Sequence, residues 1–579
     1  MGIHYFVDAS NLIVSSNKQP KKTMRYYKGN YNQMLEKSIQ DNWDMPALTN
    51  YVTGETYCYK DLASAIAEIH ILFEEVGIRP NDKIAVVGKN TPEWAVVFLA
   101  TLSYGAIIVP ILQNFPVDDI HHIVNHSEAK LLFVSDNLKD QVQEENIKRV
   151  KCIYCYNEKY CLYTSYKKSV PQKIQELREM LKVKYPNGVQ KEDIKYAERK
   201  NEDIFAINYT SGTTGFSKGV VQTVDNIVGN IGFVKEMGLA KPGNKILTFL
   251  PLAHAYGCTL DFLSQIVNGG HITFLIKLPA PNVLIKAFDA IRPSVIFTVP
   301  LVVEKIYRSV AEPILTKHAA EMSEEQMEQN IYPNVRNKLI QLFGGEFSQV
   351  IIGGAPLNAD IEQGLKKLKF PFAVGYGMTE CAPLISFIGM EKFIAKSVGV
   401  VVPNMEVKIA SSDPEKIAGE ILVKGQNVMM GYYKDEENTA KVIESDGWMH
   451  TGDIGTLDKD NNLFIKGRCK TMILGPSGQN IYPEALEAKL NNMPFVSECL
   501  VIKGEEKLVA LVYPDFNAMD EIGIDHKELE NIMEDNRKKY NKMVANYEQI
   551  SEIRLYPNEF EKTPKKNIKR YLYESQKGK

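Results

Sequence analysis

One segment combines hydroxyl, glycine and lysine residues at a spacing that suits a polyphosphate ligand. It spans residues 209–220 and reads YTSGTTGFSKGV. Its glycines let backbone N–H groups approach phosphate oxygens at little conformational cost, and Lys218 adds a charge for the β- and γ-phosphates. Because Lys218 is followed by glycine and valine rather than by serine or threonine, the segment is not a Walker A loop. We expect phosphate contacts from Thr210, Ser211, Gly212, Thr213, Thr214, Gly215 and Lys218.

A second glycine-rich segment could hold a flat base. Residues 351–356, IIGGAP, have the pattern of a strand that ends in glycines. Nucleotides bind in α/β proteins at the carboxyl ends of the strands. We therefore expect Gly353, Gly354 and Ala355 to line an adenine.

The elements that must position these segments alternate between helix and strand. Residues 60–78 have apolar side chains at helical spacing and end near Gly77, whereas residues 82–90 form an apolar run typical of a buried parallel strand. Similar alternation recurs to about residue 356, so the sequence predicts an α/β fold with parallel sheets covered by helices. A flexible surface turn is the simpler interpretation of residues 209–220. It does not explain why a strand-like stretch leads directly into them.

Four further motifs extend the pattern along the chain. They are PLAHAYG at 251–257, VGYGMTECAPLIS at 374–386, GWMHTGDIG at 447–455 and GRCKTMILGPSGQNIYPEALE at 467–487. Together with the first segment they resemble the adenylate-forming superfamily, which comprises acyl-CoA synthetases, luciferases and the adenylation domains of peptide synthetases. The chain is most similar to long-chain fatty acid CoA ligases. One small departure is Ser217, which stands where this family usually has proline.

The resemblance assigns roles to residues of the middle motifs. Tyr376, with Gly377 beside it, would stack on the adenine, and Thr379 would contact the α-phosphate. Glu380 would hold Mg²⁺ with Thr210 nearby, in keeping with the preference of that ion for hard oxygen ligands. His254 would lie near the substrate carboxylate, although a turn histidine with a structural hydrogen bond is the simpler interpretation of that residue alone.

The later motifs supply the ribose contacts and a hinge. By resemblance Asp453 would accept hydrogen bonds from both ribose hydroxyls, and Arg468 would make a second ribose or phosphate contact. Lys470 falls where the family has its hinge between two domain orientations. Gly478 would flank the tunnel for the pantetheine arm of coenzyme A.

The implied reaction uses ATP, Mg²⁺ and coenzyme A in two steps. A fatty acid carboxylate attacks the α-phosphorus and releases pyrophosphate, after which the thiol attacks the acyl carbonyl. Related enzymes place a C-terminal lysine on the first step, but here Asn567 occupies that position in the tail EFEKTPKKNIKRYLY. Lysines 565, 566 and 569 flank Asn567, and we select Lys566 as the catalytic lysine. A solvated basic tail is the simpler alternative.

Composition excludes some classes of function. The formal net charge is -3, which gives no basic excess for a nucleic-acid partner. No apolar run has the length of a transmembrane span.

The eight cysteines are scattered, so we expect a reduced, cytoplasmic protein. A CxxC at Cys152 and Cys155 with Cys161 nearby has three of the four ligands of a zinc site, so a structural strand is the better interpretation. Tyr26 and Tyr27, among basic neighbours, could contact a bilayer peripherally, but a disordered arm is the better interpretation of this segment.

The predicted fold class is α/β, with a large N-terminal domain of helix-covered sheets plus a β-rich subdomain, and a small mobile α+β C-terminal domain. We expect a polar arm over residues 1–30, the adenylation domain over 31–469, its β-rich part from about 400, and the mobile domain over 470–579. The sequence leaves open the acyl chain length, the acceptor thiol and the oligomeric state, for which a homodimer is one candidate. A medium-chain or aryl acid ligase, an acyl-AMP ligase and a binding protein without catalysis remain alternatives.

Overall fold

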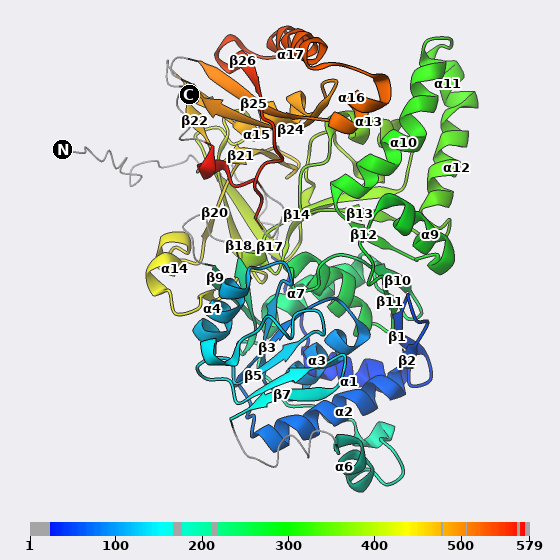
Figure 1. Cartoon of the computed structure of the whole chain (residues 1–579), viewed down its shortest axis with the longest axis vertical. Coiled ribbons are helices and arrows are strands. Elements are labelled where there is room, and N and C mark those ends of the chain that lie inside the picture. Colours follow the sequence, from blue (N-terminus) through cyan, green and yellow to red (C-terminus); the bar gives the residue numbers. More distant parts are fainter. Residues whose placement is uncertain are drawn as a thin grey trace, which may run out of the picture.

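The structure is a computed structural model. It describes residues 24–165, 176–210, 217–475, 479–504, 507–563 and 568–573. In Figure 1 the elements of the C-terminal part lie at one end of the long axis, and a large sheet with helix α2 lies at the other end.

The largest sheet has eight strands in the order β19-β9-β8-β4-β3-β5-β6-β7. Its central strands, from β8 through β6, run parallel, and antiparallel strands close both edges. In chain order the bounds are β3 Lys83–Val87, β4 Ile107–Ile111, β5 Leu131–Val134, β6 Cys152–Cys155, β7 Tyr160–Thr164, β8 Ile204–Thr210, β9 Lys218–Thr223 and β19 Gly431–Tyr432.

Helices cover both faces of this sheet. Ile84 and Val86 of β3 pack in one core with helices α2 (Tyr59–Val76) and α3 (Pro92–Ser103). Ala85 and Val87, which point to the opposite face, pack in a second core with α4 (Val117–Ser127). This two-sided burial explains why the strand is an uninterrupted apolar run, as the sequence predicted.

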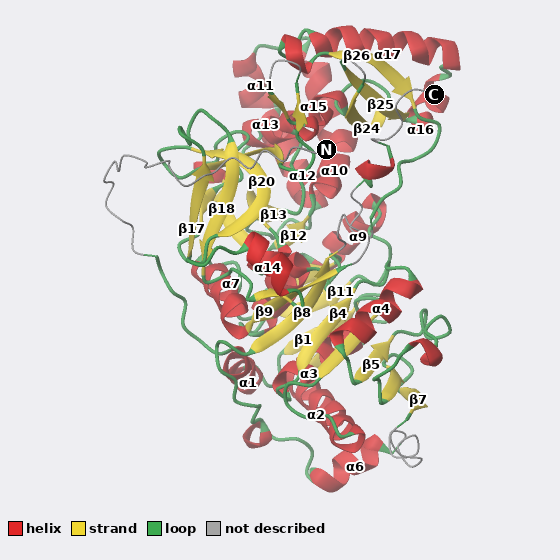
Figure 2. Ribbon diagram, turned by 90° about the vertical axis from the view of Figure 1, so that its left-hand side faces the viewer, coloured by secondary structure: helices red, strands yellow, loops and turns green. Residues whose placement is uncertain are grey.

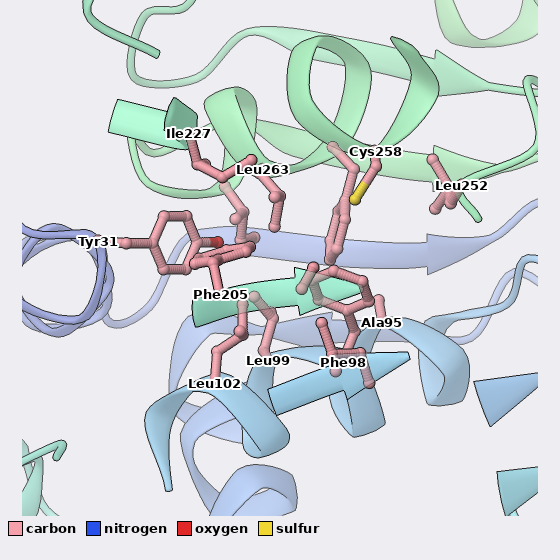
Figure 3. Packing of buried hydrophobic residues seen from close by; sticks show 14 of the residues in the cluster. Tyr31, Ala95, Phe98, Leu99, Leu102, Phe205, Ile227, Leu252, Cys258 and Leu263 are labelled. Atoms are coloured by element: carbon pink, nitrogen blue, oxygen red, sulfur yellow. The ribbon is translucent and has the colours of Figure 1, made fainter. Parts of the chain in front are cut away.

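The first core continues into the next layer of the molecule. Figure 3 shows Tyr31, Phe98, Phe205 and Leu263, which come from separate elements, packed together. The rings of Tyr31 and Phe205 meet edge to face at 5.1 Å between centroids. Helix α2 ends where the sequence predicted, because Gly77 adopts the left-handed conformation with φ 72° that closes a helix at low cost.

Two further sheets complete the helix-covered part. The first has the order β12-β13-β14-β15-β16 and the second β10-β11-β1-β2. Their bounds are β1 Pro46–Asn50, β2 Thr56–Cys58, β10 Lys245–Thr248, β11 His271–Phe274, β12 Ile296–Thr298, β13 Val350–Ile352, β14 Phe372–Gly377, β15 Leu384–Gly389 and β16 Val400–Val401. The helices of this region include α1 Tyr31–Asp41, α7 Val224–Glu236, α9 Pro281–Ile291, α10 Pro300–Ala319, α12 Tyr332–Leu342 and α13 Ala359–Lys367.

An antiparallel sheet, β17-β18-β20-β21, follows where the sequence pattern changes to short strands. Figure 2 shows it between the large sheet and the C-terminal elements along the long axis. Beyond it a hairpin β22-β23 leads to a three-stranded sheet, β24-β25-β26, and to helices α15 and α17. The bounds are β17 Met405–Ala410, β18 Gly419–Gly425, β20 Met449–Leu457, β21 Leu463–Arg468, β22 Ile473–Leu474, β23 Asn480–Ile481, α15 Pro483–Leu490, β24 Val496–Lys503, β25 Leu508–Pro514, α17 His526–Asn541 and β26 Ile550–Leu555.

Part of the N-terminal arm is ordered against the protein, which the sequence did not predict. Arg25 pairs with Glu236 of α7, and the Tyr27 hydroxyl donates to the same carboxylate at 2.6 Å. The Tyr27 ring also fills the space that a side chain at Gly232 would need. The expectation of a disordered arm is therefore wrong for the residues from Met24 onward.

The cysteine cluster forms a strand, as predicted. Cys152 and Cys155 begin and end the buried strand β6, and Cys161 lies on the neighbouring strand β7. The sulfur atoms of Cys152 and Cys161 are 3.4 Å apart, and all eight cysteines are free. Within the described parts of the chain, no helix combines the length and the apolar character that crossing a bilayer requires.

Candidate active site

The hairpin of β8 and β9 carries the two described ends of the phosphate segment. Thr210 closes β8 and Lys218 opens β9, and the two residues pair directly across the hairpin. A side chain at Gly219 would approach Ile207 within 2.9 Å, so a glycine is needed beside Lys218. Five of the predicted phosphate ligands, together with Gly478 and Lys566, lie outside the described residues. The five are Ser211, Gly212, Thr213, Thr214 and Gly215.

A tyrosine that the sequence did not single out connects Lys218 with Glu380. The Lys218 ammonium lies 4.9 Å from the centre of the Tyr432 ring. The Tyr432 hydroxyl donates to Glu380 Oε1 at 3.1 Å, and burial together with that carboxylate raises the Tyr432 pKa. Strand β19 places the ring there by pairing with β9. Lys218, the predicted phosphate contact, and Glu380, the predicted magnesium ligand, thus share Tyr432 as a neighbour.

Buried amides hold the loop that carries Thr379 and Glu380. Asn208 donates to the side-chain oxygen of Gln222, whose amide donates to the Thr379 carbonyl, each at 2.8 Å. A Cβ atom at Gly377 would lie 2.1 Å from the carbonyl oxygen of Pro383, so only glycine fits there. These contacts place the loop over the same edge of the sheet as Lys218.

Asp453, Tyr376 and Arg468 form a second group. The Tyr376 hydroxyl donates to Asp453 Oδ2 at 2.6 Å, and Arg468 Nε lies 3.2 Å from Oδ1. Register explains the second contact, because Asp453 and Arg468 pair directly between β20 and β21. Burial raises the Asp453 pKa, and the Arg468 charge and the tyrosine donor oppose that effect. The Asp453 side chain is 12% exposed and the Arg468 side chain 66% exposed, so the arginine is the solvent-accessible partner.

A pocket joins this group to His254. His254, Gly353, Gly354, Tyr376 and Gly377 all line it. The exposed Ala355 does not line this pocket, so its predicted contact with an adenine stays untested. The remaining walls are mainly apolar and include Phe233, Leu239, Tyr256, Leu260, Phe297, Leu384 and Phe387. The arrangement suits a ligand with an apolar body and a polar end near Tyr376.

A buried acid lies in the helical turn behind this pocket. Residues 257–263 form a π-helix, a rare geometry that often marks functional sites. Within it Asp261 is fully buried, and the Thr248 hydroxyl lies beside its carboxylate but outside ordinary hydrogen-bond geometry. Burial raises the Asp261 pKa from its ordinary value of 3.8 to about 7. No sequence pattern indicates that this residue is buried, because an isolated aspartate in a helical segment usually faces solvent.

Comparison with known proteins places the chain in a family. Residues 35–433, more than half of the sequence, match the family described as AMP-binding enzyme. The chain belongs to this family. Among curated relatives, 4-coumarate–CoA ligase CCL1 of Humulus lupulus is 28% identical over 554 residues, which cover 91% of this chain and 90% of the relative. The long-chain-fatty-acid–CoA ligase heimdall of Drosophila melanogaster is 25% identical over 521 residues, which cover 83% and 75%.

Solved structures share the fold of this AMP-binding enzyme. ATP-bound MatB from Rhodopseudomonas palustris superposes with a TM-score of 0.71 at 20% identity, covering 94% of this chain and 98% of that one. The anthranilate CoA ligase AuaEII in complex with anthranoyl-AMP gives 0.73 at 18% identity, covering 95% and 97%. The predicted α/β class and the predicted family are both confirmed.

The site fits ATP with Mg²⁺ only if phosphate supplies most of the metal ligands. Among the described residues no group of three or more His, Cys, Asp or Glu side chains could hold a metal ion. Glu380 supplies one carboxylate, and Tyr432 lies between it and Lys218. Mg²⁺ commonly binds to one or two protein carboxylates and takes its other ligands from phosphate and water. The donor set is therefore suited to a metal that arrives with a nucleotide.

Proposed function

We propose that this AMP-binding enzyme is an ATP-dependent acyl-CoA ligase. It would convert a fatty acid to its adenylate with release of pyrophosphate and then transfer the acyl group to coenzyme A. The apolar pocket that ends beside Tyr376 carries the proposal, because Tyr376 also donates to the buried Asp453. The apolar pocket and the residues expected to bind the nucleotide therefore share Tyr376.

The chain's own residues would act in the first step mainly by positioning and charge. Among the described residues Lys218 forms no salt bridge and lies on the face of the Tyr432 ring, so its ammonium could turn to a phosphate when one binds. Asp453 would accept the ribose hydroxyls, while the flat surface at Gly353 and Gly354 would receive the adenine. His254 would face the substrate carboxylate. Charge that develops on the phosphate oxygens is best stabilised by groups already in place.

Mg²⁺ would bind to Glu380, with Thr210 nearby, and would supply charge neutralisation to the phosphates. Tyr432 would orient the Glu380 carboxylate through its hydroxyl. Removing that donor should therefore change the metal requirement rather than the binding of the acid.

The second step would use the C-terminal part, which we propose begins near Lys470 and moves. Polar contacts at Asn492 link it to the helix-covered part of the chain. Asn492 accepts from Arg308 of α10 at 3.3 Å and donates to Asp360 of α13 at 3.2 Å. Polar contacts of this kind exchange readily with water, which favours a domain that changes orientation. Lys566 remains our choice for the lysine of the first step.

An aryl acid is the second candidate substrate, and one observation favours it. The rings of Phe233, Tyr256, Phe297 and Phe387 line the pocket, and flat substrates stack well on aromatic walls. The 4-coumarate–CoA ligase relatives also cover most of this chain. A pocket lined by rings would discriminate between a straight chain and a ring by shape.

A pyrophosphate-release assay decides between these substrates. Saturated acids from C2 to C18 and 4-coumarate would each be assayed with ATP, Mg²⁺ and coenzyme A. We expect the highest kcat/KM for a fatty acid of long chain. A higher value for 4-coumarate would identify an aryl acid ligase. Acid-dependent ATP–pyrophosphate exchange without thioester would point to an acyl-AMP ligase, and tight ATP binding without exchange would identify a binding protein.

A further inference from the structure

Three lysines lie side by side where neighbouring parallel strands begin. Lys83 opens β3, and Lys130 and Lys151 immediately precede β5 and β6. The Lys130 amide donates to the Lys83 carbonyl at 2.8 Å, and the Lys151 amide donates to the Lys130 carbonyl at 2.7 Å. The ladder therefore puts the three residues in register on adjacent strands, which are about 4.8 Å apart. We call them the lysine row.

The lysine row points to one face of the sheet. The residues after the three lysines, Ile84, Leu131 and Cys152, all pack in the first core. Because side chains alternate along a strand, the lysines share the opposite face. Like charges in neighbouring register positions destabilise a sheet unless something compensates them.

Nearby acids compensate only part of this charge. Asp82 pairs with Lys130 at 2.6 Å. Glu128 pairs with Arg149 and with Lys434 and is therefore already shared. Among the described residues Lys83 forms no salt bridge, and its ammonium lies 5.7 Å from the centre of the Tyr433 ring.

The row faces an open pocket. Its volume is about 450 Å³, within the roughly 300–1,000 Å³ typical of small-molecule sites. The lining residues are Asp82, Lys83, Glu128, Lys130, Arg149 and Lys151. Four cations against two acids leave a net charge of +2 on the lining. That value matches a phosphate group, which carries about −1.5 to −2 charges near neutral pH.

We propose that the lysine row binds a phosphate group, either inorganic phosphate or the phosphomonoester of a small molecule. Lys83 would turn from the Tyr433 ring to the ligand. Lys151 would contact it from a fixed position, because its ammonium donates to the Gly77 carbonyl at 2.9 Å. Burial, followed by the Lys130 charge, lowers the Lys151 pKa, and a bound anion would reverse the second effect.

This site is separate from the candidate active site. Lys83 lies at the amino end of β3, whereas Thr210 lies at the carboxyl end of β8, and the two strands run parallel within one sheet. A strand of five residues spans about 16 Å, so one phosphate group cannot reach both places. The proposal therefore does not depend on the enzyme's acid substrate.

Isothermal titration with phosphate tests the proposal. Lys218→Gln, used as the background, weakens the nucleotide site so that the second site dominates the signal. We expect one inorganic phosphate per chain in this background. Adding Lys83→Gln or Lys151→Gln should weaken binding about tenfold or more, the size of one lost charge-assisted hydrogen bond. Lys148→Gln, an exposed neighbour outside the row, should leave the affinity unchanged.

Two further arms make the result decisive. Lys83→Arg keeps the charge and should retain binding, so it separates charge from folding, and melting curves would check that each variant folds. Glycerol 3-phosphate would be titrated in parallel with inorganic phosphate. Tighter binding of the ester identifies a phosphomonoester ligand, and tighter binding of the free ion identifies inorganic phosphate. No binding in the Lys218→Gln background, or binding that Lys83→Gln and Lys151→Gln leave unchanged, overturns the proposal.

Discussion

Asp261→Asn should stabilise the enzyme increasingly as the pH rises. The wild-type carboxyl has its pKa raised from 3.8 to about 7, so the folded state binds a proton that the unfolded state has lost between those values. Stability therefore falls as the pH rises from about 4 to 7 and stays low above that range. At about 1.36 kcal/mol per pKa unit, ionisation of the buried carboxyl lowers the free energy of unfolding by about 4 kcal/mol above pH 8.

The variant removes this pH-dependent cost because asparagine does not ionise. Its amide could add a penalty of its own as an unsatisfied donor, but that penalty would not vary with pH. Between pH 5 and pH 8 the stability difference between variant and wild type should therefore widen by about 3 kcal/mol in favour of the variant.

Urea unfolding at pH 5, 6.5 and 8 measures this difference. Tryptophan fluorescence is a suitable probe, because Trp94 lies in the same core with its ring 6.2 Å from that of Phe262, the residue after Asp261. Asp460→Asn, at an exposed position, is the matched control and should show no such trend. A stability difference that stays constant from pH 5 to 8 would refute the reasoning about the buried carboxyl.

Substitutions at three residues test the active site. Tyr432→Phe should raise the Mg²⁺ concentration needed for half-maximal rate about threefold to tenfold, since it removes the donor to Glu380 but keeps the ring beneath Lys218. Tyr432→Leu should lower the rate further, and equal effects of the two variants would contradict this division of roles. Asp453→Ala should raise the KM for ATP about tenfold or more with a smaller change in the KM for the acid, as steady-state kinetics would show. Lys566→Ala should slow adenylation about a hundredfold and thiolysis of a preformed acyl-AMP far less, and equal losses in the two half-reactions would reject Lys566.

Local sequence patterns predicted the elements well where burial is continuous. Helix α2 and strand β3 follow directly from apolar spacing and from Gly77, because both faces of the sheet are covered. The contact of Asp453 with Tyr376 was predictable only as two roles at one nucleotide, because the two residues lie on strands of different sheets and meet only when those sheets pack together.

The features that the sequence did not predict leave no distinctive local pattern in the chain. Tyr432 comes from a strand of two residues, too short to leave a periodic pattern. Each lysine of the lysine row looks like an ordinary charge before an apolar strand, and only the ladder shows that the three are neighbours. Asp261 lies in an irregular helical turn that apolar periodicity cannot distinguish from a regular one.

Strand β19 has a practical consequence for any attempt to isolate the nucleotide-binding part. It covers the outer edge of β9, which carries Lys218, and it comes from a segment more than two hundred residues later in the chain. A recombinant fragment that stopped before Gly431 would expose that edge to pairing with other chains and would tend to aggregate. It would also lose the ring beneath Lys218. The apparent seam between the helix-covered sheets and the later β-rich region is therefore a poor place to divide the gene.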